Sequence, residues 1–245
     1  MSYDRTRPYN QLPLLPPPDE AIMTVDCLQA MSNANRALAE LKGLARKLPN
    51  QSMLVNTIAL REAKASTEIE NIFTTDDDLY RALSGDEPGL TSNVKEVLRY
   101  RQALWAGFGR IKADRIVTRD LILAIYQQIK EMNDGFRPPF AEVVIRRRGS
   151  DTPGGTVIYT PPRGEGVLDE KMENLIDYMN DDVRYPYDPL IKLAISHYQF
   201  EAIHPFRDGN GRTGRILNIL FLVFKNLLEI PILYLSSYII ENKED

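Results

Sequence analysis

Apolar residues recur at intervals of three and four positions along most of the chain, and this spacing places them on one face of an α-helix. The first such stretch runs from residue 25 to residue 44 and stops before Pro49, so it predicts one or two helices. Further helices are predicted at 52–72, 75–83, 92–108, 118–132, 167–179, 189–202 and 212–228. We therefore expect a mostly α fold in the form of a helical bundle.

Two segments depart from this helical pattern. Residues 143–145 and 156–158 are β-branched runs on either side of a turn rich in Gly, Pro and Asp, which is typical of a β-hairpin. Residues 7–20 are rich in proline, which fixes φ and removes a backbone donor. We expect this N-terminal arm to be extended, either as a strap over the domain or as a disordered tail.

Composition limits the classes of function. The chain has 245 residues, 43% of them hydrophobic, which is enough for one substantial core. Its formal net charge of -4 argues against a surface built for nucleic acid or anionic membrane, so any phosphate site must be local. A single cysteine, Cys27, and the lack of a secretory leader or a long apolar run lead us to expect a cytoplasmic protein without membrane contact or direct nucleic-acid binding.

Residues 204–215, HPFRDGNGRTGR, place an unusual set of polar groups where one helix ends and the next begins. Pro205 disfavours a helical conformation for His204, so the histidine is expected at a helix end. The glycines that follow allow close backbone approach, and the unpaired N–H groups of the next helix can bind an anion. Arg212 and Arg215 oppose the dipole of that helix unless an anion is bound there.

Taken together, these residues offer a titratable base, a carboxylate for a hard cation, a backbone anion site and two fixed cations. Such parts can hold a magnesium nucleotide during phosphoryl or nucleotidyl transfer. Taken singly, each has a simpler interpretation, because a DGNG sequence is usually just a turn and an RxxR sequence is usually a solvated helix face. The combination favours the functional interpretation.

The helix predicted at 52–72 carries Glu62, Ser66 and Glu70 at four-residue spacing, which stacks them on one face. We expect this face to be exposed to solvent. By base rate, a carboxylate such as Glu70 on a helix rich in Glu and Lys is solvated.

Residues 204–215 resemble the HxFx[DE]GNGRxxR signature of the Fic family of protein adenylyltransferases and match it at every fixed position. Residues 66–71, STEIEN, resemble the family's inhibitory [ST]xxxE[GN] motif, with Ser66, Glu70 and Asn71 at its fixed positions. The segments LPLLPPP, ANRALAELKGLARKLPN and LREAKASTEIENIFTT are also similar to the region that accompanies the Fic core, so the resemblance covers most of the chain.

The resemblance implies transfer of AMP from ATP to a Ser, Thr or Tyr hydroxyl of a target protein and of the enzyme itself. It implies that His204 is the general base, with an unperturbed pKa of about 6.5 that suits this role. Phe206 would anchor the loop in the core, and Asp208 would bind Mg²⁺. The implied ATP-binding residues, with Asn210 acting through its side chain, are Gly209, Asn210, Gly211, Arg212, Thr213, Gly214, Arg215 and Asn242.

The resemblance also implies a Fic-type helical bundle with a β-hairpin flap, and an enzyme that is autoinhibited. Residues 1–90 would form the arm and the inhibitory helical region, and residues 91–245 the catalytic core, with the flap at about 142–160. Glu70 would pair with Arg215 until the γ-phosphate of productively bound ATP takes its place. The target protein would dock on the flap as an added strand.

Other interpretations stay open. Some relatives remove AMP or transfer a different phosphate-containing group. A non-enzymatic alternative is a regulatory interaction module that senses nucleotide, although a sensor needs no general base such as His204. A homo-oligomer is also left open.

Overall fold

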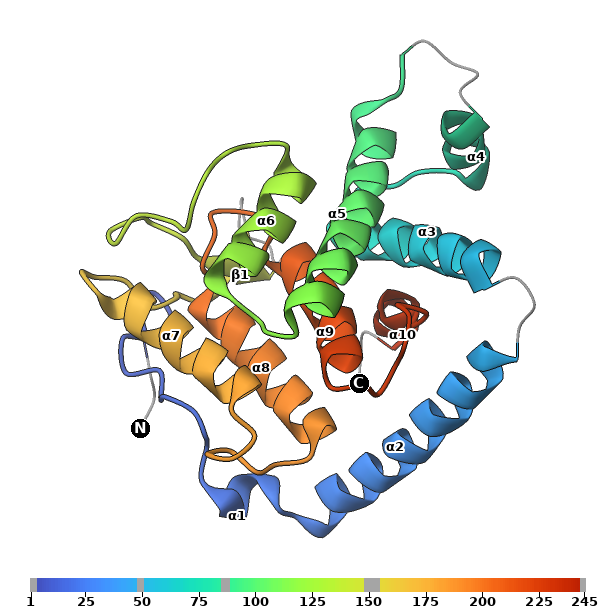
Figure 1. Ribbon diagram of the computed structural model, residues 1–245. Coiled ribbons are helices and arrows are strands. Elements are labelled where there is room, and N and C mark those ends of the chain that lie inside the picture. Colours follow the sequence, from blue (N-terminus) through green and yellow to red (C-terminus); the bar gives the residue numbers. More distant parts are fainter. Residues whose placement is uncertain (1–3, 48–50, 85–88, 148–154, 243–245) are drawn as a thin grey trace.

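The computed structural model describes residues 4–47, 51–84, 89–147 and 155–242 and shows helices with a single hairpin (Figure 1). The helices are α1 Asp19–Ile22, α2 Val25–Arg46, α3 Gln51–Ile69, α4 Asp76–Ser84, α5 Ser92–Asp114, α6 Arg119–Lys130, α7 Val167–Asn180, α8 Pro189–Ile203, α9 Asn210–Phe224 and α10 Leu235–Glu241. The strands are β1 Ile145–Arg147 and β2 Thr156–Tyr159, paired antiparallel. The expectation of a mostly α fold with a β-hairpin is confirmed.

Helix α9 forms the centre of the core. Most of its residues are buried, and α5, α6 and α8 all pack against it (Figure 1). Gly107 allows α5 to approach closely, because a Cβ at this position would lie 2.5 Å from Leu220 Cδ1. The first turn of α9 carries the polar signature, so a buried helix at the centre of the core positions it.

Several helix ends follow from local sequence. The side chains of Thr91, Thr118 and Asp188 accept backbone N–H bonds at the starts of α5, α6 and α8. The structure differs from the sequence expectation in several places. Helices α1 and α10 are additional, and α5 continues to Asp114. Helix α3 ends at Ile69 instead of residue 72, α9 spans Asn210–Phe224 instead of 212–228, and β1 begins at Ile145 instead of residue 143. Residues 148–154, which include the expected turn, lie outside the described residues.

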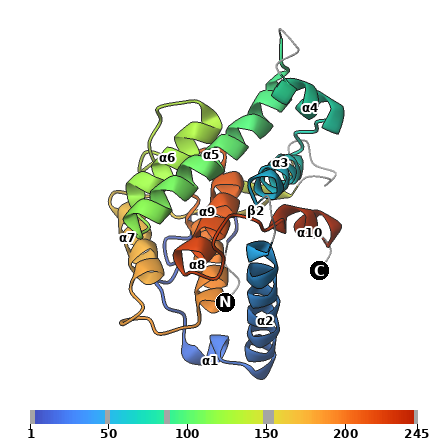
Figure 2. The ribbon, with the colours of Figure 1, turned by 45° about the vertical axis from the view of Figure 1, so that its right-hand side comes forward.

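Helix α2 is one continuous helix along an edge of the molecule (Figure 2). Its predicted apolar face is only partly covered: Leu38 is buried, whereas Val25, Leu28 and Leu44 are exposed. The helix contacts the core mainly at α8, so periodicity identified the element but overstated its burial.

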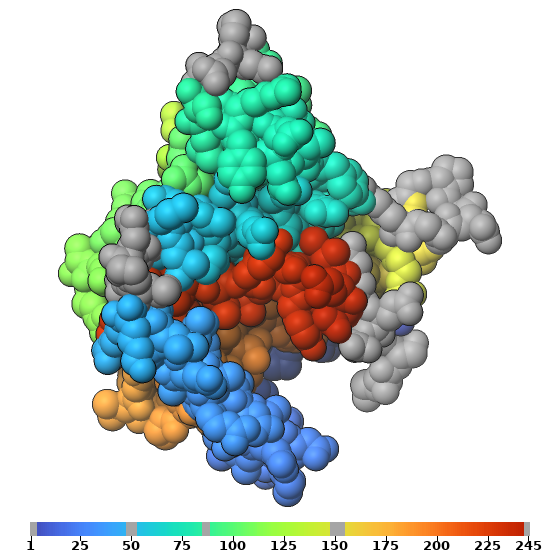
Figure 3. All heavy atoms as spheres, turned by 90° about the vertical axis from the view of Figure 1, so that its right-hand side faces the viewer, coloured from blue at the N-terminus to red at the C-terminus, as the bar shows by residue number. Residues whose placement is uncertain are grey.

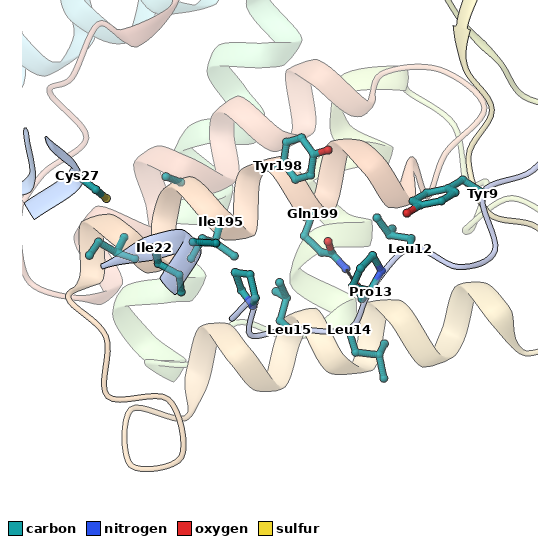
Figure 4. Close-up of a pocket in the computed structure, with 14 residues that line it drawn as sticks. Tyr9, Leu12, Pro13, Leu14, Leu15, Ile22, Cys27, Ile195, Tyr198 and Gln199 are labelled. Atoms are coloured by element: carbon teal, nitrogen blue, oxygen red, sulfur yellow. Dashed lines mark hydrogen bonds between the residues drawn. The ribbon is translucent and has the colours of Figure 1, made fainter. Parts of the chain in front are cut away.

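The N-terminal arm is a strap that lies against the hairpin, α7 and α8. The backbone N–H of Tyr9 donates to Thr160 O at 3.0 Å, and the buried Lys171 Nζ donates to Leu12 O at 2.8 Å. Gln199 Nε2 of α8 donates to Pro13 O at 2.8 Å. Between the arm and α8 lies an apolar pocket of about 500 Å³ (Figure 4).

Among the described helices, we find none with the length and apolar content needed to cross a bilayer.

Candidate active site

His204 lies directly after α8, as Pro205 predicts, with a left-handed backbone at φ 52°. Its N–H donates to Phe200 O at 2.9 Å, and its ring Nδ1 lies 3.3 Å from Glu201 O. Because a carbonyl can only accept, this contact places the ring proton on Nδ1 and leaves the lone pair of Nε2 free. Burial lowers the pKa of His204 to about 4, so the expected unperturbed value is wrong. The ring is therefore neutral near pH 7 and able to accept a proton.

Arg137 holds the end of α8 in place, a role that no pattern in the sequence indicated. The residue is buried, its Nε donates to His204 O at 2.8 Å, and its Nη2 donates to Ile203 O at 3.1 Å and Pro162 O at 2.5 Å. A cation beside the last carbonyls of a helix is favourable, because these carbonyls carry the negative end of the dipole. Arg137 thus fixes the backbone that carries His204.

The loop after His204 is anchored in the core by Phe206, as expected. Its buried ring stacks on Tyr126, with centroids 3.8 Å apart and planes 5° from parallel. Asn210 closes the loop, since Phe206 N donates to its Oδ1 and its Nδ2 donates to Phe206 O, each at 2.9 Å. The amide of Asn210 thus holds the loop, and its expected contact with phosphate stays a prediction.

The glycines leave the start of α9 accessible to an anion. Gly209 has a φ of 82°, which few other residues adopt. A Cβ at Gly211 would lie 2.6 Å from Glu70 Oε1 and 2.8 Å from Arg215 Nη1. Asn210, Gly211 and Arg212 form the first turn of α9, where backbone N–H groups have no intrahelical acceptor. An acceptor with several oxygens fits this turn better than a single carbonyl.

Asp208 and Arg212 belong to a charge network with two partners that the sequence did not reveal. Lys130 Nζ of α6 lies 2.6 Å from Asp208 Oδ2, and Arg212 Nη2 lies 3.4 Å from Asp208 Oδ1. The buried Arg212 also forms an ion pair with Glu96 of α5. The exposed carboxylate of Asp208 can exchange Lys130 for another cation, whereas Arg212 is already held.

Arg215 is buried and bonded to α3. Its Nη2 lies 2.9 Å from Glu70 Oε1 and donates to Ser66 O at 2.9 Å, and its Nε donates to Ser66 Oγ at 2.7 Å. The expected exposed face is wrong for Glu62 and Ser66, which are buried, but Glu70 does lie at the cleft. A charge-assisted pair therefore links residues 145 positions apart.

The backbone conformation of Asn71 turns the chain away from α3, whose last residue, Ile69, comes just before Glu70. Its φ is 63°, a left-handed conformation that asparagine and glycine adopt most readily. The N–H of Ile72 donates back to Thr67 O at 3.1 Å, which ends the helix as left-handed caps commonly do. Asn71 thus contributes through its backbone conformation, and its side chain is exposed.

Glu201 is a further titratable residue at the site that sequence reasoning missed. Burial raises the pKa of its carboxyl to about 7, against the opposing effect of Arg215. Its Oε1 lies 2.6 Å from the position that a Cβ at Gly214 would take, so Gly214 makes room for this side chain. Thr213, also in α9, is fully buried and has no exposed atoms to offer a ligand.

Two of the expected ligands are Asn242, for the nucleotide, and Asp208, for the metal. Asn242 follows α10, and its Nδ2 donates to Tyr238 O at 2.9 Å; among the described residues its side chain has no hydrogen bond to the 204–215 segment. The described residues also contain no cluster of three His, Cys, Asp or Glu side chains that could hold a metal. Asp208 alone suits Mg²⁺, which commonly binds one or two carboxylates together with substrate phosphates.

Comparison with known proteins agrees with this geometry. The family model described as Fic/DOC family N-terminal matches residues 28–109, and the Fic/DOC family model matches residues 116–222. A probable protein adenylyltransferase of Aquifex aeolicus is 29% identical over 184 residues, which are 73% of this chain and 52% of that protein. The protein adenylyltransferase fic-1 of Caenorhabditis elegans is 42% identical over 59 residues, 24% of this chain and 11% of that protein.

Solved structures show the same fold. A Fic family protein from Desulfovibrio desulfuricans superposes with a TM-score of 0.66 at 24% identity, covering 88% of this chain and 64% of that one. Fic-1 of C. elegans gives a TM-score of 0.61 at 22% identity, covering 89% and 65%. The matched part is thus about half of the A. aeolicus relative and about two thirds of these structures. The chain belongs to the Fic/DOC family.

Proposed function

We propose that the protein is an adenylyltransferase that moves AMP from ATP to a hydroxyl side chain of a target protein and of itself. The observation that carries this proposal is the arrangement around the start of α9. Two buried arginines, Arg212 and Arg215, and the free N–H groups of the first turn lie on one side of a loop whose other end carries the neutral ring of His204. The relatives named as protein adenylyltransferases support the same reaction.

The reaction follows from these positions. The hydroxyl oxygen of a Ser, Thr or Tyr attacks the α-phosphorus, its proton passes to His204 Nε2, and the bond from the α-phosphorus to the leaving pyrophosphate breaks. The N–H groups of Gly211 and its neighbours, together with Arg215, stabilise the charge that collects on the phosphate oxygens. Asp208 would hold Mg²⁺ in place of Lys130, and the ion would supply positive charge at the phosphates.

We further propose that Glu70 inhibits the enzyme. Arg215 cannot meet a γ-phosphate while it is paired with Glu70, and the carboxylate itself repels an anion at the same place. If the pair is closed about 99% of the time, about one molecule in a hundred accepts ATP productively. Breaking the pair should then raise transfer by one to two orders of magnitude.

The test uses ATP labelled on the α-phosphate, with incorporation into protein as the readout. Glu70→Gly should incorporate about 10- to 100-fold more label than the unmodified chain. Glu68→Gly is the matched control, because it places glycine two residues earlier, in the last turn of α3, without removing the Arg215 partner. Glu70→Gly combined with His204→Ala should still bind nucleotide but transfer no label.

Each other result has a defined meaning. Label from the γ-phosphate in place of the α-phosphate would identify a kinase-type reaction. Nucleotide binding without transfer in every variant would favour a sensing module, and release of AMP from a modified protein would favour the de-adenylylating alternative. Equal incorporation by Glu70→Gly and Glu68→Gly would remove the inhibitory role of Glu70.

For the partner, we propose that the target adds a strand to an edge of the β1–β2 hairpin. The two strands pair Ile145 with Tyr159 and Arg147 with Thr156, and a two-stranded hairpin of this kind can accept a further strand at an edge. Tyr159 OH donates to Ala202 O at 2.9 Å, so the hairpin is tied to the end of α8 near His204. A cytoplasmic location, a homo-oligomer, the absence of direct nucleic-acid binding and the boundary near residue 90 stay predictions.

A further inference from the structure

Glu62 is a buried carboxylate that joins three elements and has no part in the proposed chemistry. Only 1% of the residue is exposed. The backbone N–H of Ser236 donates to Glu62 Oε2 at 3.0 Å, and the Ser236 hydroxyl donates to Oε1 at 2.5 Å. The Tyr100 hydroxyl of α5 donates to Oε1 at 3.2 Å. A carboxylate in such a place must be held by donors, because burial without partners would cost several kcal/mol.

The same helix carries the inhibitory contact. Glu62 and Ser66 lie on successive turns of α3, and Glu70 directly follows its last residue, Ile69, so the three move together if the end of the helix shifts or frays. Ser66 accepts two bonds from Arg215, and Glu70 supplies the ion pair one turn further on. Buried polar contacts thus join α10 to Glu62 and join Arg215 to Ser66, one turn further along α3.

The placement of α10 supports a coupling between these ends. Among the described elements, α10 packs mainly against α3. The surfaces of the two helices lie side by side in Figure 3. Ser236 is fully buried in the first turn of α10, whereas Ser237 points outward and bonds Glu241 Oε1 at 3.0 Å. An apolar residue at position 62 would suffice to pack the two helices together, whereas a carboxylate bonded on both oxygens fixes their register.

We propose that Glu62 is a positioning residue that ties α10 to the last two turns of α3 and thereby sets how firmly Glu70 holds Arg215. The inference rests on the inhibitory role proposed for Glu70. It adds a second point of control, remote from the phosphates, at which a displacement of α10 weakens the Glu70–Arg215 pair. By linkage, an event that breaks the pair also loosens α10.

Hydrogen exchange of the full chain without nucleotide tests the structural step. Ser236→Ala removes one donor to Glu62 and should speed exchange about tenfold or more in residues 66–72, as expected for loss of a hydrogen bond to a charged group. Ser237→Ala, the matched control, should leave residues 66–72 unchanged. Glu62→Gln keeps the size of the side chain and should shift the same residues in the same direction.

Incorporation of α-label tests the regulatory step. Ser236→Ala should raise incorporation several-fold in the unmodified background and should add nothing in the Glu70→Gly background, because the pair is already absent there. An equal gain in both backgrounds would overturn the proposal. So would faster exchange confined to residues 235–241 in both Ser236→Ala and Glu62→Gln, since Glu62 would then only anchor α10. If no variant incorporates label, the proposed activity fails, and exchange in residues 66–72 alone decides the coupling.

Discussion

Burial favours the neutral form of both titratable side chains at the end of α8. It lowers the pKa of His204 to about 4 and raises the pKa of the Glu201 carboxyl to about 7. A neutral imidazole can take a proton from a hydroxyl, whereas an imidazolium cannot. The charges of Arg215 and Glu70 affect the pKa of Glu201. Ionisation of Glu201 therefore alters the electrostatic potential at the proposed phosphate site.

These shifts predict an unusual pH profile for transfer by Glu70→Gly. His204 should stay neutral well below its ordinary value, so the rate should not fall as the pH drops through about 6.5. A step near pH 7 would belong to Glu201 and should vanish in Glu201→Gln. The measurement is the initial rate of α-label incorporation between about pH 5 and pH 8. A fall centred near 6.5 in both variants would mean that His204 is solvated like a free histidine.

The same lowered pKa has a consequence for stability. Above about pH 6.5, His204 is neutral in both the folded and the unfolded chain and contributes nothing to pH dependence. As the pH falls from about 6.5 towards about 4, the unfolded chain binds a proton that the folded chain rejects. The contribution of His204 to the free energy of unfolding therefore decreases over that range, and His204→Gln should remove this part of the decrease in urea titrations.

At Gly211 the addition of one methyl group should displace Arg215 and thereby reduce transfer. Gly211→Ala places a Cβ against Glu70 Oε1 and Arg215 Nη1, at 2.6 and 2.8 Å, so the pair must shift. We expect transfer to fall at least about tenfold through displacement of Arg215, and Glu70→Gly should not restore it, because the contact with Arg215 remains. Gly109→Ala is the control, since nothing lies within 4 Å of a Cβ there. Full activity of Gly211→Ala combined with Glu70→Gly would contradict the geometry.

At the scale of the elements, apolar periodicity and turn residues predicted the long helices, because apolar residues at helical spacing are buried in them, and α2, α5, α6 and α8 begin at a side-chain cap. The prediction failed where tertiary contacts decide. Helix α10 has only seven residues and is held by the buried bond of Ser236 to Glu62, a contact with α3 that no local pattern reveals. The start of β1 was placed two residues early, because β-branched residues favour strands but pairing with β2 begins at Ile145.

Arg137 should matter to both the fold and the chemistry at the end of α8. Arg137→Met leaves the carbonyls of Ile203, His204 and Pro162 without their donor in a buried place, which should cost about 2–4 kcal/mol of unfolding free energy. Transfer should fall by more than the fraction of unfolded protein accounts for, because His204 is displaced in the folded protein. Arg137→Lys should recover part of both, and the exposed Arg46→Met should change neither. Unfolding in urea and label incorporation on the same samples separate the two effects.

At the scale of the whole molecule, the sequence predicted the signature residues but not the groups that complete the site. His204, Asp208 and Arg215 lie in one short segment, so their proximity follows from local structure. Glu96 comes from α5, Lys130 from α6 and Arg137 from the loop after α6, and each looks like an ordinary surface charge in the sequence. Glu70 could be paired with Arg215 only through the family resemblance, because the bond spans 145 positions.

The N-terminal arm should contribute to stability as part of the same folded unit. It connects the base of the hairpin, α7 and α8 through backbone bonds at Tyr9, Leu12 and Pro13, and it buries Leu12 to 5% exposure beside the core. Leu14, two residues on, remains 43% exposed at the rim of the pocket in Figure 4. Leu12→Ala should therefore lower the free energy of unfolding by about 2–5 kcal/mol.

Leu14→Ala is the matched control, because it makes the same chemical change in the same arm and should cost less than about 1 kcal/mol. Urea unfolding followed by circular dichroism gives both values, and a single transition with an unchanged slope is expected for each. If the two substitutions have equal small effects, the arm does not belong to the cooperative unit, and its bonds to Lys171 and Gln199 form independently of the core. A loss of slope for Leu12→Ala alone would instead show that the arm, α7 and α8 separate from the rest before the core opens.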